Sequence, residues 1–221
     1  MATRNWMPDC RRVPTGAYGG YGSIEATDVV CHSIEGYRKT MDTWASEKEV
    51  VHQVSYHFVL DIDGTITQYV PVNQAAWHAG RVDADTNPSV GVPWQGYQGV
   101  NPNSHTIGIG AEGFSAQNWN KAQHVSCIAI LRWLTEQHDI SFTADNLIGH
   151  CDISPMSRPD DPGPNWDKKL LLGGTVEKII PEPIKKGDFA AWTNAWLSSP
   201  STPMRYEGGY EIHQIQIPRR K

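Results

Sequence analysis

The chain has 221 residues, 39% of them hydrophobic, and carries a formal net charge of −5 with a pI near 6.0. These values predict one ordinary globular domain with a substantial core, and they exclude the strongly basic surface typical of nucleic-acid binding. No apolar run is long enough to predict membrane insertion, and the N-terminus lacks the apolar core of a secretory signal. We therefore expect a monomer that is made and folded in a cytoplasm.

The N-terminal half begins with a Gly-, Pro- and Tyr-rich arm and continues with alternating strand and helix patterns. Residues 1–23 show no clear period and predict a surface arm or loop. The turn at Asp63 and Gly64 lies between two alternating segments and predicts a hairpin, in which Tyr56 shares a face with Phe58. The predicted elements are a buried strand over 27–33, a polar helix over 35–49 and hairpin strands over 54–60 and 66–71.

The second half predicts a long loop, further strands and the strongest helix. Residues 81–104 are rich in Gly, Pro, Asn and Asp, and loops of this length are often binding elements. Strands are predicted over 106–111 and 147–148, and helices over 115–138 and 166–172. The chemistry lies in a predicted domain over 1–175. Residues 176–221 predict an extension or linker with a short amphipathic stretch, 188–197, and a β-like tail, 210–217. Together the patterns predict an α/β fold, a mixed sheet flanked by helices.

Two histidines and an acidic pair form a candidate metal site. His32 ends an apolar strand, His150 follows another, and Asp160 and Asp161 come shortly after it. Two imidazoles and one carboxylate supply three ligands and leave a fourth zinc position open, as in catalytic zinc sites. Chance is the alternative, because the chain has nine histidines. The cysteines are widely spaced and predict free thiols. Two of them, Cys31 and Cys151, adjoin the histidines, so a thiolate ligand is an alternative. Neighbouring side chains of an extended segment point to opposite faces, so we expect a site with His32 and His150 to have these cysteines turned away.

Five stretches together resemble one family, the type 2 zinc-dependent N-acetylmuramoyl-L-alanine amidases, which also includes peptidoglycan recognition proteins and phage lysozyme-amidases. They occur in the family's order and extend over roughly residues 10–172. The stretches are Val-Val-Cys-His-Ser at 29–33, Val-Ser-Tyr-His-Phe at 54–58 with Asp-Gly-Thr at 63–65, Ala-Trp-His-Ala-Gly at 76–80, Asn-Ser-His-Thr-Ile-Gly at 103–108, and Gly-His-Cys-Asp-Ile at 149–153 with Asp-Pro-Gly-Pro at 161–164.

The resemblance implies one zinc ion, held by His32, His150 and Asp161. Asp160 is the alternative third ligand, because its distance from His150 along the chain matches the cytosolic members, whereas Asp161 directly precedes the Pro-Gly pair. The resemblance also gives Tyr56 a catalytic role, in which its hydroxyl orients the water or binds the oxyanion. The alternative for Tyr56 is a core tyrosine.

Two positions depart from the family pattern. Cytosolic muropeptide amidases carry a glutamate where this chain has Gly110, and Glu112 lies two residues further on. This departure favours the lytic and recognition branch, where a tyrosine takes the role. The family's usual lysine is replaced by Pro159, which makes the neighbouring Arg158 a candidate for stabilising the oxyanion. The alternative for Arg158 is a surface ion pair.

The resemblance also implies a substrate cleft. Trp77 and His78 match its wall, where an aromatic face and an imidazole would bind sugar and stem peptide, and Asn103 positions a loop against the same groove; plain packing is the alternative for Trp77 and His78.

The resulting hypothesis is a phage endolysin that cuts between N-acetylmuramic acid and L-alanine in peptidoglycan. It would reach the wall through a separate holin-type pore, with a wall-binding module in a longer protein. The alternatives are a cytosolic amidase that recycles anhydro-muropeptides, a recognition protein that binds peptidoglycan without cutting it, and a metal-free domain with structural histidines.

Overall fold

The computed structural model describes residues 4–16, 18–47, 52–80 and 101–173, and all structural statements refer to these residues. The predicted loop over 81–104 therefore lies mostly outside them. The predicted extension over 176–221, with its helix and tail, lies wholly outside. Among the described helices, none combines the length and the apolar character that crossing a membrane requires.

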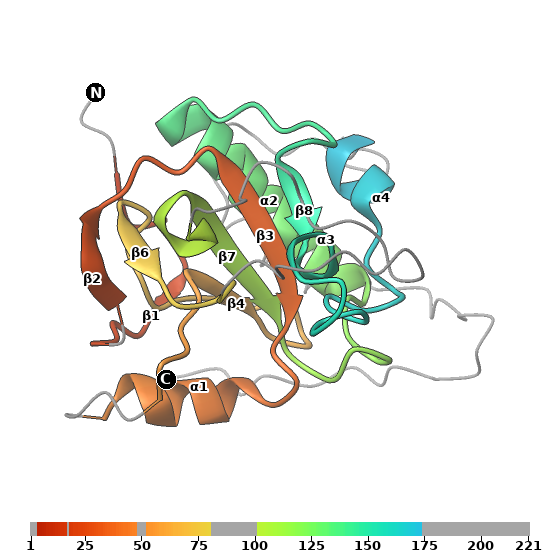
Figure 1. The fold of residues 1–221 in the computed structure, drawn as a ribbon, viewed down its shortest axis with the longest axis horizontal. Coiled ribbons are helices and arrows are strands. Elements are labelled where there is room, and N and C mark those ends of the chain that lie inside the picture. Colours follow the sequence, from red (N-terminus) through yellow and green to blue (C-terminus); the bar gives the residue numbers. More distant parts are fainter. Residues whose placement is uncertain (1–3, 17, 48–51, 81–100, 174–221) are drawn as a thin grey trace, which may run out of the picture. The chain divides into compact units, whose positions relative to one another are not determined.

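A six-stranded mixed sheet forms the centre of the fold, in the order β1-β5-β4-β7-β3-β8 (Figure 1). Strands β4, β7, β3 and β8 are mutually parallel, and β5 pairs antiparallel with β4. This arrangement confirms the α/β prediction of a mixed sheet with flanking helices. The strands that follow the arm are β3 (Asp28–Ser33), β4 (Phe58–Leu60), β5 (Ile66–Gln68), β7 (Thr106–Ala111) and β8 (Leu147–Gly149).

The N-terminal arm contains two strands, contrary to the expectation of a segment without regular structure. Strand β1 (Arg11–Arg12) pairs in parallel with β5, and β2 (Tyr18–Ser23) pairs antiparallel with β6 (Gln74–Ala76) in a separate two-stranded sheet. The side chain of Gln68 accepts a hydrogen bond from the backbone amide of Met7 at 2.7 Å and so fixes the arm. Strand β1, with two exposed residues, is too short to produce a period, and the three glycines and serine of β2 are not typical of a strand.

The helices begin later than their patterns predict. The chain before α1 (Arg38–Ala45) is held by an isolated bridge between Gly36 and Gly113. Helix α2 (Lys121–His138) begins after a capping box, in which the side chains of Asn120 and Gln123 each accept the other's backbone N–H at 3.0 Å. The remaining short elements are the 3-10 helix η2 (Pro102–Ser104), α3 (His150–Ile153) and α4 (Lys168–Gly173).

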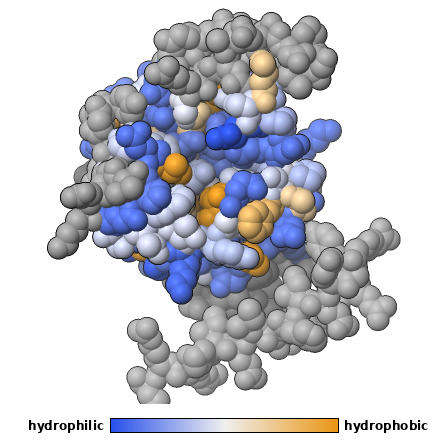
Figure 2. Space-filling view, turned by 60° about the horizontal axis from the view of Figure 1, so that its bottom comes forward, coloured by the Kyte–Doolittle hydropathy of each residue, from blue (hydrophilic) through white to orange (hydrophobic). Residues whose placement is uncertain are grey.

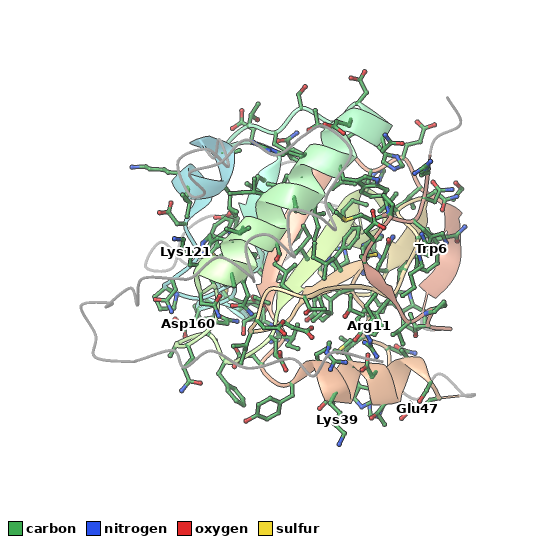
Figure 3. The ribbon with its side chains drawn as sticks, turned by 180° about the vertical axis from the view of Figure 1, so that it is seen from behind. Trp6, Arg11, Lys39, Glu47, Lys121 and Asp160 are labelled. Atoms are coloured by element: carbon green, nitrogen blue, oxygen red, sulfur yellow. The ribbon has the colours of Figure 1, made fainter. Side chains whose placement is uncertain are left out.

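The two faces of the sheet differ in chemistry. Helix α2 packs on one face, behind the sheet in Figure 1 and in front of it in Figure 3, where Trp133 meets Phe58 edge-on at 6.1 Å. Cys31 points toward this face and interacts with Cys127 of α2. Because side chains alternate along β3, His32 points to the opposite face. All four cysteines are free thiols, as predicted.

Candidate metal centre

Three side chains meet at the carboxyl end of the parallel strands. His32 lies near the end of β3, His150 is the first residue of α3 directly after β8, and Asp161 belongs to the loop that follows. The pairing of β3 with β8 brings the two histidines together, with their Nδ1 atoms 3.1 Å apart. Asp161 Oδ2 lies 2.8 Å from Nδ1 of His150 and 3.6 Å from Nδ1 of His32. One nitrogen or oxygen atom from each residue therefore faces a common point.

The loop after α3 directs Asp161, not Asp160, into this cluster. Asp161 Oδ1 accepts the backbone N–H of Ser33 at 2.7 Å, and its carbonyl oxygen accepts that of Cys151 at 2.6 Å. Asp160 is exposed, and Figure 3 shows it away from the centre of the sheet. Of the two acids in the sequence, the structure brings only Asp161 to the histidines.

Burial sets the charges of the cluster. His32 is fully buried, and desolvation lowers its pKa to about 4 despite the neighbouring carboxylate of Asp161. Burial alone would raise the pKa of Asp161, but hydrogen bonds to His150 and His32 hold it well below its usual range. At neutral pH the carboxylate is therefore ionised and the His32 imidazole is neutral, the states that metal ligands need.

The spacing of these atoms fits a small metal ion. With ligand distances near 2.0–2.1 Å, tetrahedral zinc places two of its ligand atoms roughly 3.3 Å apart. The three separations of 2.8, 3.1 and 3.6 Å lie on both sides of that value. His32, His150 and Asp161 could thus hold an ion with little movement, in agreement with the predicted ligand set.

Tyr56 lies beside the cluster, against His32. Their ring centroids are 5.2 Å apart at an interplanar angle of 63°. The alternating pattern of the sequence predicted that Tyr56 would share a face of the sheet with Phe58. This prediction is wrong, because Phe58 packs on α2, whereas Tyr56 packs in the cluster that contains Met41 of α1. The physical reason is that β4 begins at Phe58, so no strand pairing within β4 fixes the orientation of Tyr56. Burial raises the pKa of Tyr56 above its ordinary value, so its hydroxyl stays protonated at neutral pH.

Gly110 makes room for this tyrosine. A Cβ atom at Gly110 would lie 2.5 Å from Ile34 and 3.3 Å from the ring of Tyr56. Glu112 does not take the place of the missing glutamate, because its carboxylate accepts the backbone amides of Arg38 and Ile62 at 3.0 Å each. The site therefore has a tyrosine where the cytosolic pattern has a glutamate.

Arg158 is exposed at the edge of the cluster. Its guanidinium donates to the carbonyl of Ser157 at 3.0 Å, and its backbone amide donates to Ser154 at 2.8 Å. Its positive charge opposes the rise in the pKa of Tyr56 that burial causes. The charge thus acts on the site, although the structure gives no contact between Arg158 and a ligand.

The three residues expected at the substrate cleft lie in or next to the segment that contacts the histidines. Trp77 is half-buried; its backbone amide donates to Oγ of Ser55, and its carbonyl oxygen accepts the backbone amide of Ser55. His78 is buried, with Nδ1 3.0 Å from Nε2 of His32 and Nε2 3.2 Å from Oγ1 of Thr106. Asn103 is also buried, and its Oδ1 accepts the backbone amides of His78 and Ala79. His78 and Asn103 therefore lie behind the candidate ligands, and the role of the three residues in a substrate cleft stays a prediction.

Sequence reasoning missed Thr106, which contacts His78. Thr106, Gly108 and Gly110 alternate along β7, so small side chains occupy the strand face that carries Tyr56 and His78. In the sequence, this pattern of small residues at every second position could have indicated a strand face that makes room for larger side chains.

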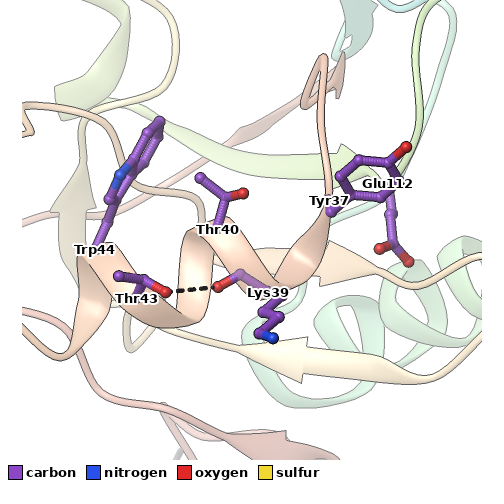
Figure 4. Close-up of a pocket in the computed structure, with 6 residues that line it drawn as sticks. All are labelled: Tyr37, Lys39, Thr40, Thr43, Trp44 and Glu112. Carbon is purple, nitrogen blue, oxygen red and sulfur yellow. Dashed lines mark hydrogen bonds between the residues drawn. The ribbon is translucent and has the colours of Figure 1, made fainter.

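A surface groove of about 540 Å³ lies beside α1 (Figure 4). Its lining consists of Tyr37, Lys39, Thr40, Thr43, Trp44 and Glu112. None of these six residues belongs to the cluster, so the groove is separate from the candidate ligands. The face seen in Figure 2, which brings the bottom of Figure 1 forward, is mostly hydrophilic with a few scattered apolar residues.

Fold and site together define a class, the α/β proteins with a two-histidine, one-carboxylate centre of the kind used by metal-dependent hydrolases. The N-acetylmuramoyl-L-alanine amidase family matches residues 23–164. The chain belongs to this family and is an N-acetylmuramoyl-L-alanine amidase.

Curated relatives and solved structures agree with this assignment. The chain is 33% identical over 186 residues to the 1,6-anhydro-N-acetylmuramyl-L-alanine amidase AmpD of Escherichia coli, covering 76% of this chain and 92% of the relative. It is 35% identical over 185 residues to AmpD of Citrobacter freundii, covering 76% and 90%. A crystal structure of a Se-Met AmpD derivative matches with a TM-score of 0.57 and 26% identity, covering 78% of this chain and 97% of that one. The structure of PlyL matches with a TM-score of 0.50 at 14% identity, covering 85% and 96%, which supports the fold alone.

Proposed function

We propose that this chain is a zinc-dependent amidase that cuts the bond between N-acetylmuramic acid and L-alanine in soluble anhydro-muropeptides. The observation that carries the proposal is the convergence of His32, His150 and Asp161 in a chain that is about one-third identical to AmpD over most of AmpD's length. Two imidazoles and one carboxylate with an open fourth position are ligands typical of catalytic zinc. A zinc ion there would supply a Lewis acid and lower the pKa of the water it binds.

The residues around the ligands supply the remaining chemistry. Tyr56 keeps its proton at neutral pH, so its hydroxyl acts as a hydrogen-bond donor to the oxygen that becomes negative when the amide is attacked. Arg158 adds positive charge to the same region but does not donate a proton, because the guanidinium pKa is above about 12. Asp161 remains ionised, so with a divalent ion the ligand set would carry a formal charge near +1.

The substrate class differs from the first hypothesis. The endolysin interpretation rested on the absence of a secretory signal and on Gly110, and the curated relatives give it no support. Their names instead specify 1,6-anhydro-muramyl substrates. We therefore also propose an activity in the cytoplasm on soluble fragments of peptidoglycan, rather than at the wall after holin-type release.

Lysis of intact wall is the second candidate, because one observation favours it. Tyr56 contacts His32, and Gly110 leaves the space for it, which is the arrangement that the resemblance connects with the lytic branch. Substrate preference separates the two candidates.

The test is a comparison of two substrates with the zinc-loaded protein. Soluble anhydro-muropeptide and purified intact cell wall are incubated at equal amide concentration, and release of peptides with a free L-alanine amino terminus is followed by mass spectrometry. We expect at least about 100-fold faster release from the soluble substrate, a difference in transition-state free energy of about 3 kcal/mol. Faster release from intact wall would establish the lytic function instead. A protein that binds no zinc, or is inactive on both substrates, would refute the proposal.

A further inference from the structure

The two candidate histidine ligands are held from behind by one short segment, His78–Ala79. His78 Nδ1 lies 3.0 Å from Nε2 of His32, and the carbonyl oxygen of Ala79 lies 3.1 Å from Nε2 of His150. In both histidines the contacted atom is therefore the ring nitrogen that does not face the metal position.

The segment is itself fixed. Asn103 Oδ1 accepts the backbone amides of His78 at 3.1 Å and Ala79 at 2.8 Å. The ring of His78 lies directly over Gly108 of β7, where a Cβ atom would come within 2.4 Å of the ring. The position of the imidazole thus depends on a strand residue without a side chain.

Hydrogen-bond donors and acceptors determine which ring nitrogens carry protons. Thr106 has a single hydroxyl proton. It donates this proton to the carbonyl oxygen of Pro102, 2.8 Å away, which is the shorter of its two contacts. The Thr106 oxygen then accepts from Nε2–H of His78, 3.2 Å away. A neutral imidazole has one N–H, so Nδ1 of His78 is an acceptor and His32 must donate to it from Nε2. This leaves Nδ1 of His32 as a lone pair facing the cluster.

His150 has an acceptor at each ring nitrogen: the carbonyl oxygen of Ala79 lies 3.1 Å from Nε2, and the carboxylate of Asp161 lies 2.8 Å from Nδ1. A neutral ring donates to one of them, and if Nδ1 bound a metal ion, Nε2 would donate to Ala79. The Nδ1 atoms of His32 and His150 are 3.1 Å apart, so one cation could contact both.

We infer that His78 and Thr106 are positioning residues. Their hydrogen bonds, between Thr106 and His78 and between His78 and His32, hold His32 in the tautomer that binds zinc through Nδ1. This inference rests on the zinc site of the proposed function and adds residues to it. Outer hydrogen-bond partners of metal-bound histidines typically affect metal affinity by about 10–100-fold.

Thr106→Val tests the hydrogen bonds from Thr106 through His78 to His32, and Thr67→Val is the matched control. Both threonines are fully buried in strands of the same sheet, but the hydroxyl of Thr67 has no hydrogen-bond partner. The metal-free proteins are titrated with zinc against a chromophoric chelator. We expect Thr106→Val to weaken zinc binding about 10-fold, Thr67→Val to leave it unchanged, and Thr106→Ser, which keeps the hydroxyl, to restore most of the affinity.

His78→Leu removes both of these hydrogen bonds at once and should weaken zinc binding by up to about 100-fold. Nitrogen chemical shifts of the His32 ring report the tautomer directly, and we expect Nε2–H in the zinc-loaded wild type. A loaded ring protonated at Nδ1, or equal zinc affinity in Thr106→Val and wild type, would overturn the inference. Failure of wild type to bind zinc would overturn the proposed function itself, so the two failures can be told apart.

Discussion

Two polar regions of this molecule differ in how far their polar side chains are buried and in whether these side chains are charged. At the carboxyl end of β3 and β8, neutral imidazoles are buried and contact one another directly: His32 and His57 are fully buried, and His78 nearly so. Beside α1, Arg11 and Arg38 pair with Asp42 near solvent, and Figure 3 shows Arg11 next to this helix.

This difference in burial predicts which of the two regions affects activity and which affects only stability. Burying polar groups costs free energy unless every group finds a partner, and the buried histidines find theirs in one another and in Asp161. Exposed ion pairs cost little and stabilise little. We therefore expect changes in the histidine region to alter metal binding and activity, and changes beside α1 to alter stability slightly or not at all.

The largest expected effect comes from Asp161→Ala. It removes a ligand and the only carboxylate in the cluster, so zinc affinity should fall by more than about 100-fold, beyond the usual effect of an outer-shell residue. Amidase activity should disappear with the zinc. Asp160→Ala is the control, because that side chain is exposed and outside the cluster. Metal content by elemental analysis, with activity on soluble muropeptide, measures both. Equal zinc loss in the two variants would show that the loop, not the ligand, had been disturbed.

Tyr56→Phe should have the next largest effect. Removing a donor to a developing oxyanion typically lowers kcat by about 10²–10³-fold. Zinc content should not change, because Tyr56 contacts His32 through ring packing and is not a ligand. Tyr69→Phe makes the same chemical change at a tyrosine whose hydroxyl donates to Asp42 at 2.6 Å. The control should keep its activity. If Tyr56→Phe retained full kcat, Tyr56 would be a core residue.

The pH dependence of stability provides a smaller effect. Burial lowers the pKa of His57 from 6.5 to about 4, so below pH 6.5 the unfolded chain takes up a proton that the folded chain does not. Stability is therefore lost as pH falls from 6.5 toward 4, by about 2 kcal/mol at pH 5 for this one residue. Denaturant unfolding of the metal-free protein at pH 7 and pH 5 measures the loss. His57→Gln should reduce the difference, and an unchanged difference would show that His57 is protonated in the fold.

The sequence predicted much of this arrangement, for identifiable reasons. Strand β7 and the candidate ligands His32 and His150 follow from apolar runs that end in a polar residue, which is local information. The family resemblance favoured Asp161 over Asp160, but only the amide of Ser33, 128 positions away, shows how that carboxylate is held. The role of His78 could not be predicted, because it depends on Thr106 and on the space above Gly108, two contacts between distant segments. In the arm, β1 was missed because it has only two residues, and β2 because its sequence, Tyr-Gly-Gly-Tyr-Gly-Ser, is rich in glycine.

The smallest expected effect comes from the region beside α1. Arg11 forms a two-pronged ion pair with Asp42, at 2.7 and 2.8 Å, with 40% of its side chain exposed. Exposed pairs of this kind usually contribute less than about 1 kcal/mol, and in Arg11→Ala the carboxylate would keep Arg38 and Tyr69 as partners. The free energy of unfolding should therefore fall by less than about 1 kcal/mol, measured with denaturant at low and high salt. Zinc affinity and kcat should match wild type. A change in either would mean that β1 and α1 are coupled to the histidine cluster, because Tyr56 packs in the same core cluster as Met41 of α1 and Tyr69.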